Sequence, residues 1–192
     1  MTHFWWVRHG PTHQKSFVGW RDVPADLSDT ALVSAVAAYL PKDAVLLSSD
    51  LQRARQTADA VQTGQPRAPD MPALREINFG AWDGLTHTEV SARDPVIARQ
   101  YWEQPGEIAP PGGESWNAVS SRVNDAVDQL IAHHTGRNIV VVAHFGVILT
   151  QVQRALGCTA YEALGYPIDN LSVTDMRWNG SGWSVGTINH LP

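Results

Sequence analysis

Two histidines and two arginines have the residue types and the spacing to perform phosphoryl transfer. Each follows a short apolar segment of the 192-residue chain: Arg8 and His9 come after residues 4–7, Arg53 after residues 45–47, and His144 after residues 139–143. Phosphoryl transfer needs a nucleophile or proton donor beside cations that spread charge over the phosphate oxygens. Histidine can supply the first, and Arg8 and Arg53 can form a cationic clamp.

The three apolar segments are predicted to be strands of one sheet. Residues 4–7 are aromatic and β-branched and end before Gly10-Pro11, residues 45–47 are wholly apolar, and residues 139–143 are continuous enough for a central parallel strand. In an open parallel sheet, ligands bind outside the carboxyl ends of the strands. The polar residues that follow the strands are therefore expected to share one site.

Backbone groups are expected to contribute to the same site. Residues 48–50 (Ser-Ser-Asp) are N-cap residue types, and they predict a helix that carries Arg53 in its first turns and ends near Val61. The start of this helix would present free N–H groups to an anion. Gly10 is expected to let the backbone approach the ligand closely.

Apolar residues at helical spacing predict further helices over residues 28–40, which starts at Ser28, and over 115–134 and 145–156. Residues 171–178 and 183–188 are predicted to form a hairpin. Strands that alternate with helices across long connections predict an α/β fold, and we expect one domain over residues 1–192. Residues 84–113 follow no such pattern, and we expect them to form an excursion over one face that acts as a lid or specificity loop.

The composition excludes several classes of protein. A net charge of −5 argues against a nucleic-acid-binding protein, which needs a broad basic surface. The longest apolar runs fall far below the roughly 20 residues that span a bilayer, so no membrane segment is expected. The single Cys158 and an N-terminus without the features of a secretion signal predict a cytoplasmic protein.

Four segments, in order along the chain, resemble the histidine phosphatase superfamily, also called phosphoglycerate mutase-like. They are Val-Arg-His-Gly-Pro-Thr at 7–12, Ser-Ser-Asp-Leu-Gln-Arg-Ala-Arg-Gln-Thr-Ala at 48–58, Leu-Arg-Glu-Ile-Asn-Phe-Gly-Ala-Trp-Asp-Gly at 74–84, and Val-Val-Val-Ala-His-Phe-Gly at 140–146. Pro-Pro-Gly-Gly-Glu-Ser at 110–115 resembles the small bacterial phosphatase branch that includes α-ribazole phosphatase. The resemblance implies a single-domain three-layer α/β/α sandwich with a mostly parallel central sheet.

The resemblance also implies a role for each site residue. His9 would be the nucleophile that becomes phosphohistidine, and Glu76 would be the proton donor. The transferring phosphoryl group would be bound by Arg8, Arg53 and His144, with a hydroxyl contact from Thr12. Two departures from the family pattern bear on this site: Phe145 stands where the family commonly has Gly, and Pro11-Thr12-His13 replaces a frequent Glu-Thr or Glu-Ser. The first would narrow the pocket or tilt its loop.

Other interpretations of these residues remain open. Glu76 could instead be a loop carboxylate that pairs with Arg75 or caps a turn. Trp82 and Trp102 are the tryptophans expected to meet a substrate, and Arg21 is a further candidate at the pocket mouth. No metal and no cofactor are expected, because two arginines supply the positive charge that a metal supplies elsewhere.

Three functions fit the pattern. The first is a phosphatase that hydrolyses the phosphohistidine formed from a small-molecule phosphate ester. The second is a mutase, and the third is a non-catalytic module that binds a phosphorylated ligand. Residues 84–115 carry Arg93 and Arg99 against five carboxylates, a formal balance of 2 − 5 = −3 that favours the phosphatase over a mutase, which must retain a small polyanion. A homodimer is left open.

Overall fold

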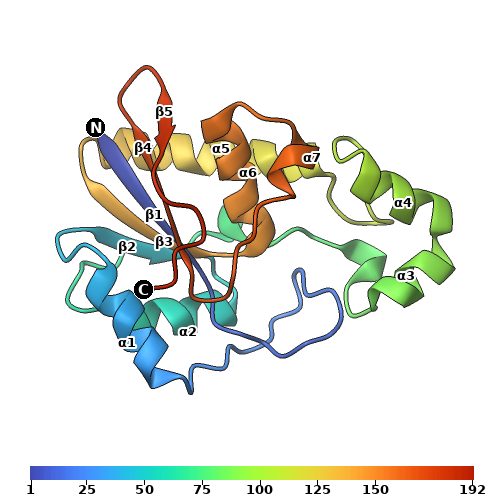
Figure 1. Ribbon diagram of the computed structural model, residues 1–192, viewed down its shortest axis with the longest axis horizontal. Helices are drawn as coiled ribbons and strands as arrows, with labels where there is room; N and C mark the ends of the chain where they lie inside the picture. The colour runs from blue at the N-terminus through green and yellow to red at the C-terminus, as the bar shows by residue number, and fades with distance from the viewer.

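A five-stranded sheet with helices on both faces organises the chain, and the computed structural model describes all residues, 1–192 (Figure 1). The strands are β1 (Thr2–Arg8), β2 (Val45–Ser48), β3 (Asn138–Ala143), β4 (Val173–Trp178) and β5 (Trp183–Val185), in the order β2-β3-β1-β4-β5. β1, β2 and β3 are parallel to one another, and β4 and β5 form an antiparallel edge. The predicted α/β fold with a mostly parallel centre is confirmed.

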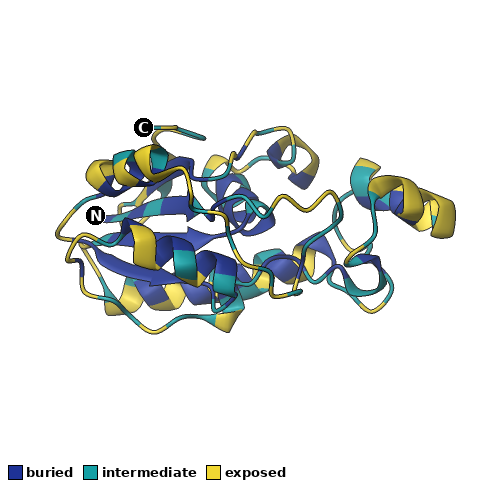
Figure 2. Cartoon of the chain, turned by 90° about the horizontal axis from the view of Figure 1, so that it is seen from below, coloured by how far each residue is buried: buried dark blue, intermediate teal, exposed yellow.

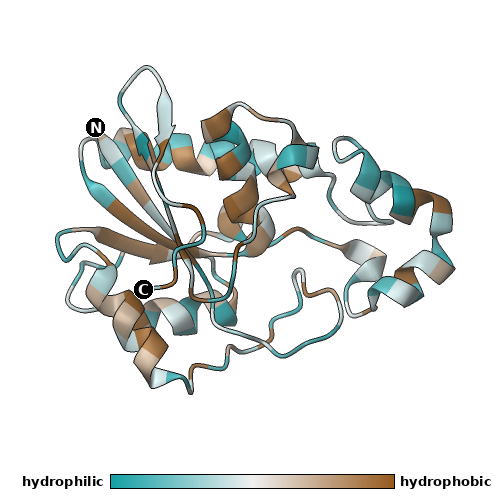
Figure 3. Cartoon of the chain, in the orientation of Figure 1, coloured by the Kyte–Doolittle hydropathy of each residue, from teal (hydrophilic) through white to brown (hydrophobic).

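Successive side chains of a strand point to opposite faces of the sheet, so the strands contribute to two separate hydrophobic cores, one on each face. On one face, Phe4, Trp6 and Val141 contact helices α5 (Trp116–His133) and α6 (Phe145–Leu156). On the other face, Val140 and Val142 contact helices α1 (Thr30–Tyr39) and α2 (Gln52–Val61). Figure 2 shows the buried sheet between these two helical layers, and Figure 3 shows the apolar character of β2 and β3. The architecture is therefore a three-layer α/β/α sandwich.

Helices α1 and α2 do not start with the capping residues that the sequence predicts. α1 is capped by Asp29, whose side chain accepts from Leu32 N, and not by Ser28. α2 begins after Leu51 with no side-chain cap, because Asp50 forms an ion pair with Arg75 (2.6 Å). The expectation that residues 48–50 cap this helix was wrong.

The excursion between the Glu76 segment and α5 contains two helices that the sequence pattern did not reveal. These are α3 (His87–Arg93), which starts with a capping box formed by Thr86 and Glu89, and α4 (Pro95–Glu103). They lie away from the sheet, beyond the ends of α5 and α7 (Ala160–Ala163), at the right of Figure 1. Short 3-10 turns, η1 (Pro72–Leu74) and η2 (Gly80–Trp82), lead from α2 into this excursion. None of the helices is long and apolar enough to cross a membrane.

Trp82 joins the excursion to the core of the protein. Its side chain is fully buried, its Nε1 donates to Asp94 Oδ2 (2.8 Å), and its ring meets the edge of Tyr101 at 5.4 Å between centroids. Such a residue cannot touch a ligand without unfolding the excursion. The expectation that Trp82 meets a substrate was therefore wrong, and its role is to hold α3 and α4 in place.

We expect Trp82→Leu to lower the free energy of unfolding by about 3 kcal/mol, because it leaves a cavity and an unpaired Asp94. Urea denaturation measures this loss. Trp178→Leu is the matched control, since Trp178 is only half-buried at the end of β4. This variant should lose about 1 kcal/mol or less of its free energy of unfolding. Equal losses in the two variants would show that Trp82 is not an anchor.

Candidate active site

The register of the parallel strands brings two histidines together. Arg8 at the end of β1 lies opposite Ala143 at the end of β3, and the His9 amide donates to the Ala143 carbonyl (3.1 Å). His9 and His144 are the next residues of the two strands, and their ring centroids are 5.1 Å apart. The sequence-based expectation that polar residues meet at the carboxyl edge of the sheet is met for this pair.

The imidazole of His9 is held in one tautomer, with Nε2 unprotonated. Its Nδ1 lies 2.7 Å from the Gly10 carbonyl oxygen, which fixes the N–H on that nitrogen. Its Nε2 then carries the lone pair and accepts from Arg53 Nε (3.2 Å). Burial, reinforced by the positive charge of Arg53, lowers the pKa of His9 to about 3. The ring is therefore neutral. His9 is 6% exposed and lines the pocket.

His144 lies fully buried beside His9, and neither of its ring nitrogens has a protein partner. Burial, followed by the charge of Arg53, lowers the pKa of His144 well below its usual value. A buried imidazole without partners is costly, and such groups in a native structure usually serve a ligand. An oxyanion in front of His9 is the kind of group that could satisfy it.

Arg53 is a buried cation held by main-chain carbonyls. Its Nη1 donates to Arg21 O (2.9 Å) and its Nη2 donates to Gly19 O (2.7 Å), while only 1% of the residue is exposed. Its burial lowers the pKa of the guanidinium, but an arginine stays charged. These bonds fix the plane of the guanidinium against His9 and leave its remaining N–H groups for a ligand.

Arg8 completes the cationic part of the site from the other side. Its Nη1 donates to the Ile168 carbonyl (2.6 Å), and its Nε is buried without a partner. The guanidinium carbon lies 5.5 Å from the centre of the Phe145 ring, within the range of a cation–π contact. Phe145 thus lines the pocket and braces Arg8, which is the consequence of its replacing the usual glycine.

These residues line a pocket of about 650 Å³. Arg8, His9, Arg53, Glu76 and Thr12 are among its lining residues, whereas His144 lies behind them. The remainder of the wall is largely apolar and comes from the loop after β1, the excursion and the α6–α7 region: Gln14, Ser16, Phe17, Val18, Phe79, His87, Trp102, Phe145, Tyr161, Leu164 and Gly165. Of the expected specificity residues, Trp102 lies at the pocket.

Glu76 is at the pocket, and its carboxylate is held at the start of α6. Oε1 accepts from the amides of Ile77 (2.9 Å) and Gly146 (3.1 Å). Arg75 does not pair with it, since Arg75 binds Asp50. A Cβ atom at position 146 would lie 2.6 Å from Glu76 Oε1, so the contact needs a glycine there. The alternative in which Glu76 caps a turn agrees with its hydrogen bonds to these two amides. The carboxyl group also lies at the pocket, where it can take part in proton transfer.

Arg122 on α5 is a residue of the site that the sequence did not single out. Its Nη1 donates to Ala73 O (2.9 Å) and Arg75 O (2.8 Å), and its Nη2 donates to Glu76 O (2.9 Å). Glu114 pairs with the same guanidinium (2.7 Å) and also accepts from Asn78 N. Arg122 therefore fixes the backbone on both sides of Glu76. Its signal in the sequence was weak, because the backbone carbonyls that it binds lie more than 40 residues away.

Two further expectations about the loop after β1 need correction. Arg21 does not line the pocket: its side chain binds Asp83 (3.0 Å), Ser16 Oγ and Phe17 O. Gly10 lies close to another part of the protein and not to the pocket, since a Cβ atom at this position would lie 2.6 Å from Leu27 Cδ2. At the start of α2, the Gln52 amide donates to Asp22 Oδ1, so this N–H group is not available to an anion.

Residues 4–191 match the model of the histidine phosphatase superfamily, branch 1. A glucosyl-3-phosphoglycerate phosphatase of Mycolicibacterium vanbaalenii is 38% identical over 189 residues, which cover 91% of this chain and 80% of that protein. A bifunctional protein of Mycobacterium tuberculosis is 36% identical over 177 residues, which are 90% of this chain. The chain spans only 46% of the length of that bifunctional relative.

Solved structures share the fold along almost the whole chain. YhfR of Bacillus stearothermophilus has a TM-score of 0.88 and 27% identity, with 96% of this chain and 95% of that chain covered. An α-ribazole phosphatase from Shigella flexneri has a TM-score of 0.84 at 24% identity, with 98% and 96% covered, and at that identity the likeness concerns the fold. The resemblance inferred from the four sequence segments is confirmed.

We expect His9 to remain neutral and Nδ1-protonated at pH 5, because its pKa is lowered to about 3 by burial and by Arg53. Nitrogen-15 NMR of the imidazoles measures this directly. The free energy of unfolding should fall as pH drops from 6.5 toward 3, because the unfolded chain then binds a proton that native His9 does not. A His9 resonance that titrates near pH 6.5 would contradict the analysis.

Proposed function

Because this chain belongs to the histidine phosphatase superfamily, we propose that it hydrolyses a small-molecule phosphate monoester through a phosphohistidine formed on His9. The observation that carries the proposal is the state of His9. Its Nδ1–H is held by the Gly10 carbonyl, and its Nε2 lone pair faces the pocket beside Arg53. A neutral imidazole with a fixed tautomer is a competent nucleophile toward phosphorus.

In the first step, Nε2 of His9 attacks the phosphorus of the bound ester and the bond from phosphorus to the ester oxygen breaks. Arg8, Arg53, His144 and the Thr12 hydroxyl would bind the transferring phosphoryl oxygens, since electrostatic stabilisation there is the main demand of the reaction. Arg8 Nε and the ring nitrogens of His144 are buried and unpartnered, which suits them to this task. No metal ion and no cofactor enter the scheme.

Glu76 would supply the proton that the leaving oxygen needs. It lines the same pocket as His9, and two backbone amides fix its carboxyl group. In the second step a water molecule attacks the phosphohistidine, the phosphorus–nitrogen bond breaks, and Glu76 takes the proton of the water. Inorganic phosphate leaves, and neutral His9 is restored.

Hydrolysis fits this site better than mutase chemistry does. Arg8 and Arg53 are the two guanidinium groups in the pocket lining, so a small polyanion would find little additional charge to retain it while it reorients. In the excursion, Arg93 is used structurally: it donates to Ala81 O (2.9 Å) and pairs with Asp94 (3.4 Å). The presence of both His9 and Glu76 in the pocket favours an enzyme over a non-catalytic binding module.

We expect rapidly quenched enzyme to carry acid-labile phosphate on His9 in a single turnover of 4-nitrophenyl phosphate. His9→Ala should lose both this phosphate and turnover while remaining folded, as circular dichroism can verify, because the nucleophile is removed. His13→Ala is the matched control, since His13 lies exposed farther along the same loop and binds Asp26. Turnover without any phosphate on His9 would refute the covalent mechanism.

Arg122 is expected to act as a positioning residue for Glu76. Arg122→Met removes the bonds to the backbone of residues 73–76 and should lower kcat for alkyl phosphates by about 10–100-fold, part of the roughly 10²–10⁴-fold that general acid catalysis contributes. The loss should be smaller for 4-nitrophenyl phosphate, whose leaving group needs no proton. Arg122→Lys should restore part of the rate.

Glu76→Gln provides the reference for this experiment, because it cannot donate a proton and should show the same dependence on the leaving group. The ratio of kcat values for the two esters is the readout, and a loss of stability alone would not change it. If Arg122→Met slows both esters equally, the arginine only supports the fold.

A further inference from the structure

The charged side chains that line the pocket are few. They are the two cations Arg8 and Arg53, which face a phosphate monoester that carries up to two negative charges, and the acid Glu76; His87, an exposed imidazole, also lines the pocket. When His87 is neutral, a second anionic group on the substrate would therefore meet no uncommitted cation.

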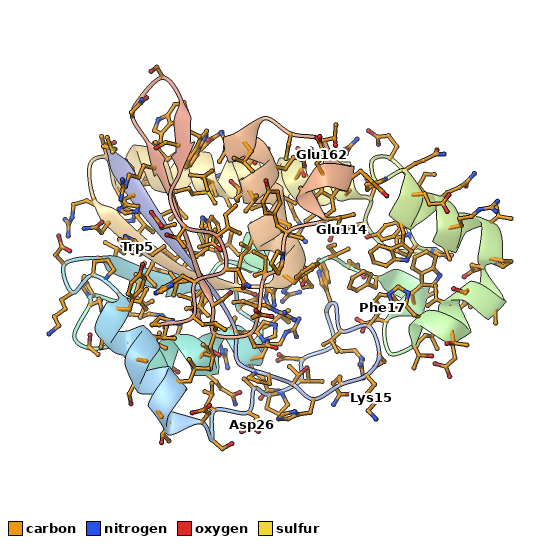
Figure 4. The ribbon with its side chains drawn as sticks, viewed as in Figure 1. Trp5, Lys15, Phe17, Asp26, Glu114 and Glu162 are labelled. Atoms are coloured by element: carbon orange, nitrogen blue, oxygen red, sulfur yellow. The ribbon has the colours of Figure 1, made fainter.

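Two other cations lie on the loop after β1, but neither reaches into the pocket. Lys15 is exposed and does not line the pocket, and Figure 4 shows it at the outer side of the loop, whereas Phe17 lies toward α3 and α4. Arg21 is bound to Asp83. The charge of the pocket is thus set by the phosphate-binding residues themselves.

The wall of the pocket on the side of the excursion is aromatic. Phe17 stacks on Trp102 with centroids 5.9 Å apart and an angle of 15° between the rings, and it lies 5.0 Å from Phe79. Other lining residues, Phe145 and Tyr161, come from α6 and α7. Flat rings on such walls offer contact area to a planar group at little cost in side-chain entropy.

Hydrogen bonds between the loop after β1 and the excursion hold this aromatic wall in place. The Phe17 amide donates to Leu85 O (2.9 Å), and the Gly84 amide donates to Phe17 O (2.9 Å). Arg21 adds a bond to the same carbonyl. The loop that carries Phe17 is therefore fastened to the excursion that carries Trp102, so binding does not have to order it.

We infer that this pocket selects monoesters whose leaving group is uncharged and planar, and that Phe17 and Trp102 determine this specificity. The inference rests on the proposed phosphatase function and names its substrate class. It separates this chain from the relative named glucosyl-3-phosphoglycerate phosphatase, because a phosphoglycerate ester carries a carboxylate that would have no cation here. Phenolic and similar aromatic monoesters fit the site.

The test compares 4-carbamoylphenyl phosphate with 4-carboxyphenyl phosphate, which match in size and differ by one negative charge. We expect kcat/KM for the neutral amide to exceed that for the carboxylate by about 10-fold or more, since a charge without a partner is costly to desolvate. Phe17→Leu and Trp102→Leu should each lower kcat/KM for the amide ester by roughly 3–10-fold, the value of an aromatic contact. Tyr39→Leu, on the far side of the sheet, should change nothing.

A second arm supplies the missing cation and compares each ester with itself, so differences in leaving-group ability cancel. Gln14 lines the pocket and is exposed, and Gln14→Arg should raise kcat/KM for the carboxylated ester several-fold while leaving that for the amide ester unchanged. Gln14→Met controls for the change in size.

Equal kcat/KM values for the two esters, or a preference for the carboxylate, in wild-type enzyme that still forms phosphate on His9 would overturn the specificity inference and leave the phosphatase intact. No effect of Phe17→Leu and Trp102→Leu on the amide ester would overturn the role of these two residues. No phosphate release from any ester, with none on His9, would instead overturn the proposed function.

Discussion

The burial of one positive charge, on Arg53, is the constraint on which the rest of the site depends. A guanidinium with 1% exposure must have its N–H groups satisfied, and the chain does this with the carbonyls of Gly19 and Arg21 and with Nε2 of His9. The bond to His9 requires an unprotonated nitrogen, so the same contact that satisfies the charge keeps the imidazole neutral. The attack on phosphorus uses the same lone pair, so this hydrogen bond breaks when the phosphohistidine forms.

This constraint extends from the phosphate-binding residues to the specificity wall. The loop whose carbonyls bind Arg53 is tied at its other contacts to the excursion: Asp83 binds the Gly19 amide (3.3 Å) and the Arg21 amide and side chain. Phe17 lies on that loop. A change in the position of the excursion would therefore move the carbonyls that bind Arg53. The residues that select the leaving group are in this way coupled to those that hold the phosphoryl group.

Much of the fold could be predicted from the sequence, because the order of apolar and polar residues in β1, β3 and α5 is typical of these elements. The apolar run of residues 139–143 predicts a buried strand, and the apolar stripe of α5 predicts a helix. The start of α2 could not be predicted in the same way. Asp50 is a capable N-cap, but Arg75 offers it an ion pair that only tertiary structure reveals.

The site shows the same division. His9, Arg8, Arg53 and His144 follow strands whose register brings their ends together, so their meeting could be foreseen. Trp82 and Trp102 have the same residue type in one segment, and only packing decides that the first is buried in the core and the second lines the pocket. Arg122 was missed because an arginine on a long helix is normally a solvent-facing residue.

The segment after β3 shows how a departure from a family pattern is accommodated. At position 146 no side chain fits, because a Cβ atom would lie 2.6 Å from Glu76 Oε1 and 2.7 Å from Ile77 Cδ1. At position 145 a large ring fits, since it points into the pocket and meets the Arg8 guanidinium. The requirement of this turn is thus the approach of Glu76 to the start of α6. Position 145 has room for a side chain, and in this chain the side chain of Phe145 adds an aromatic surface to the pocket.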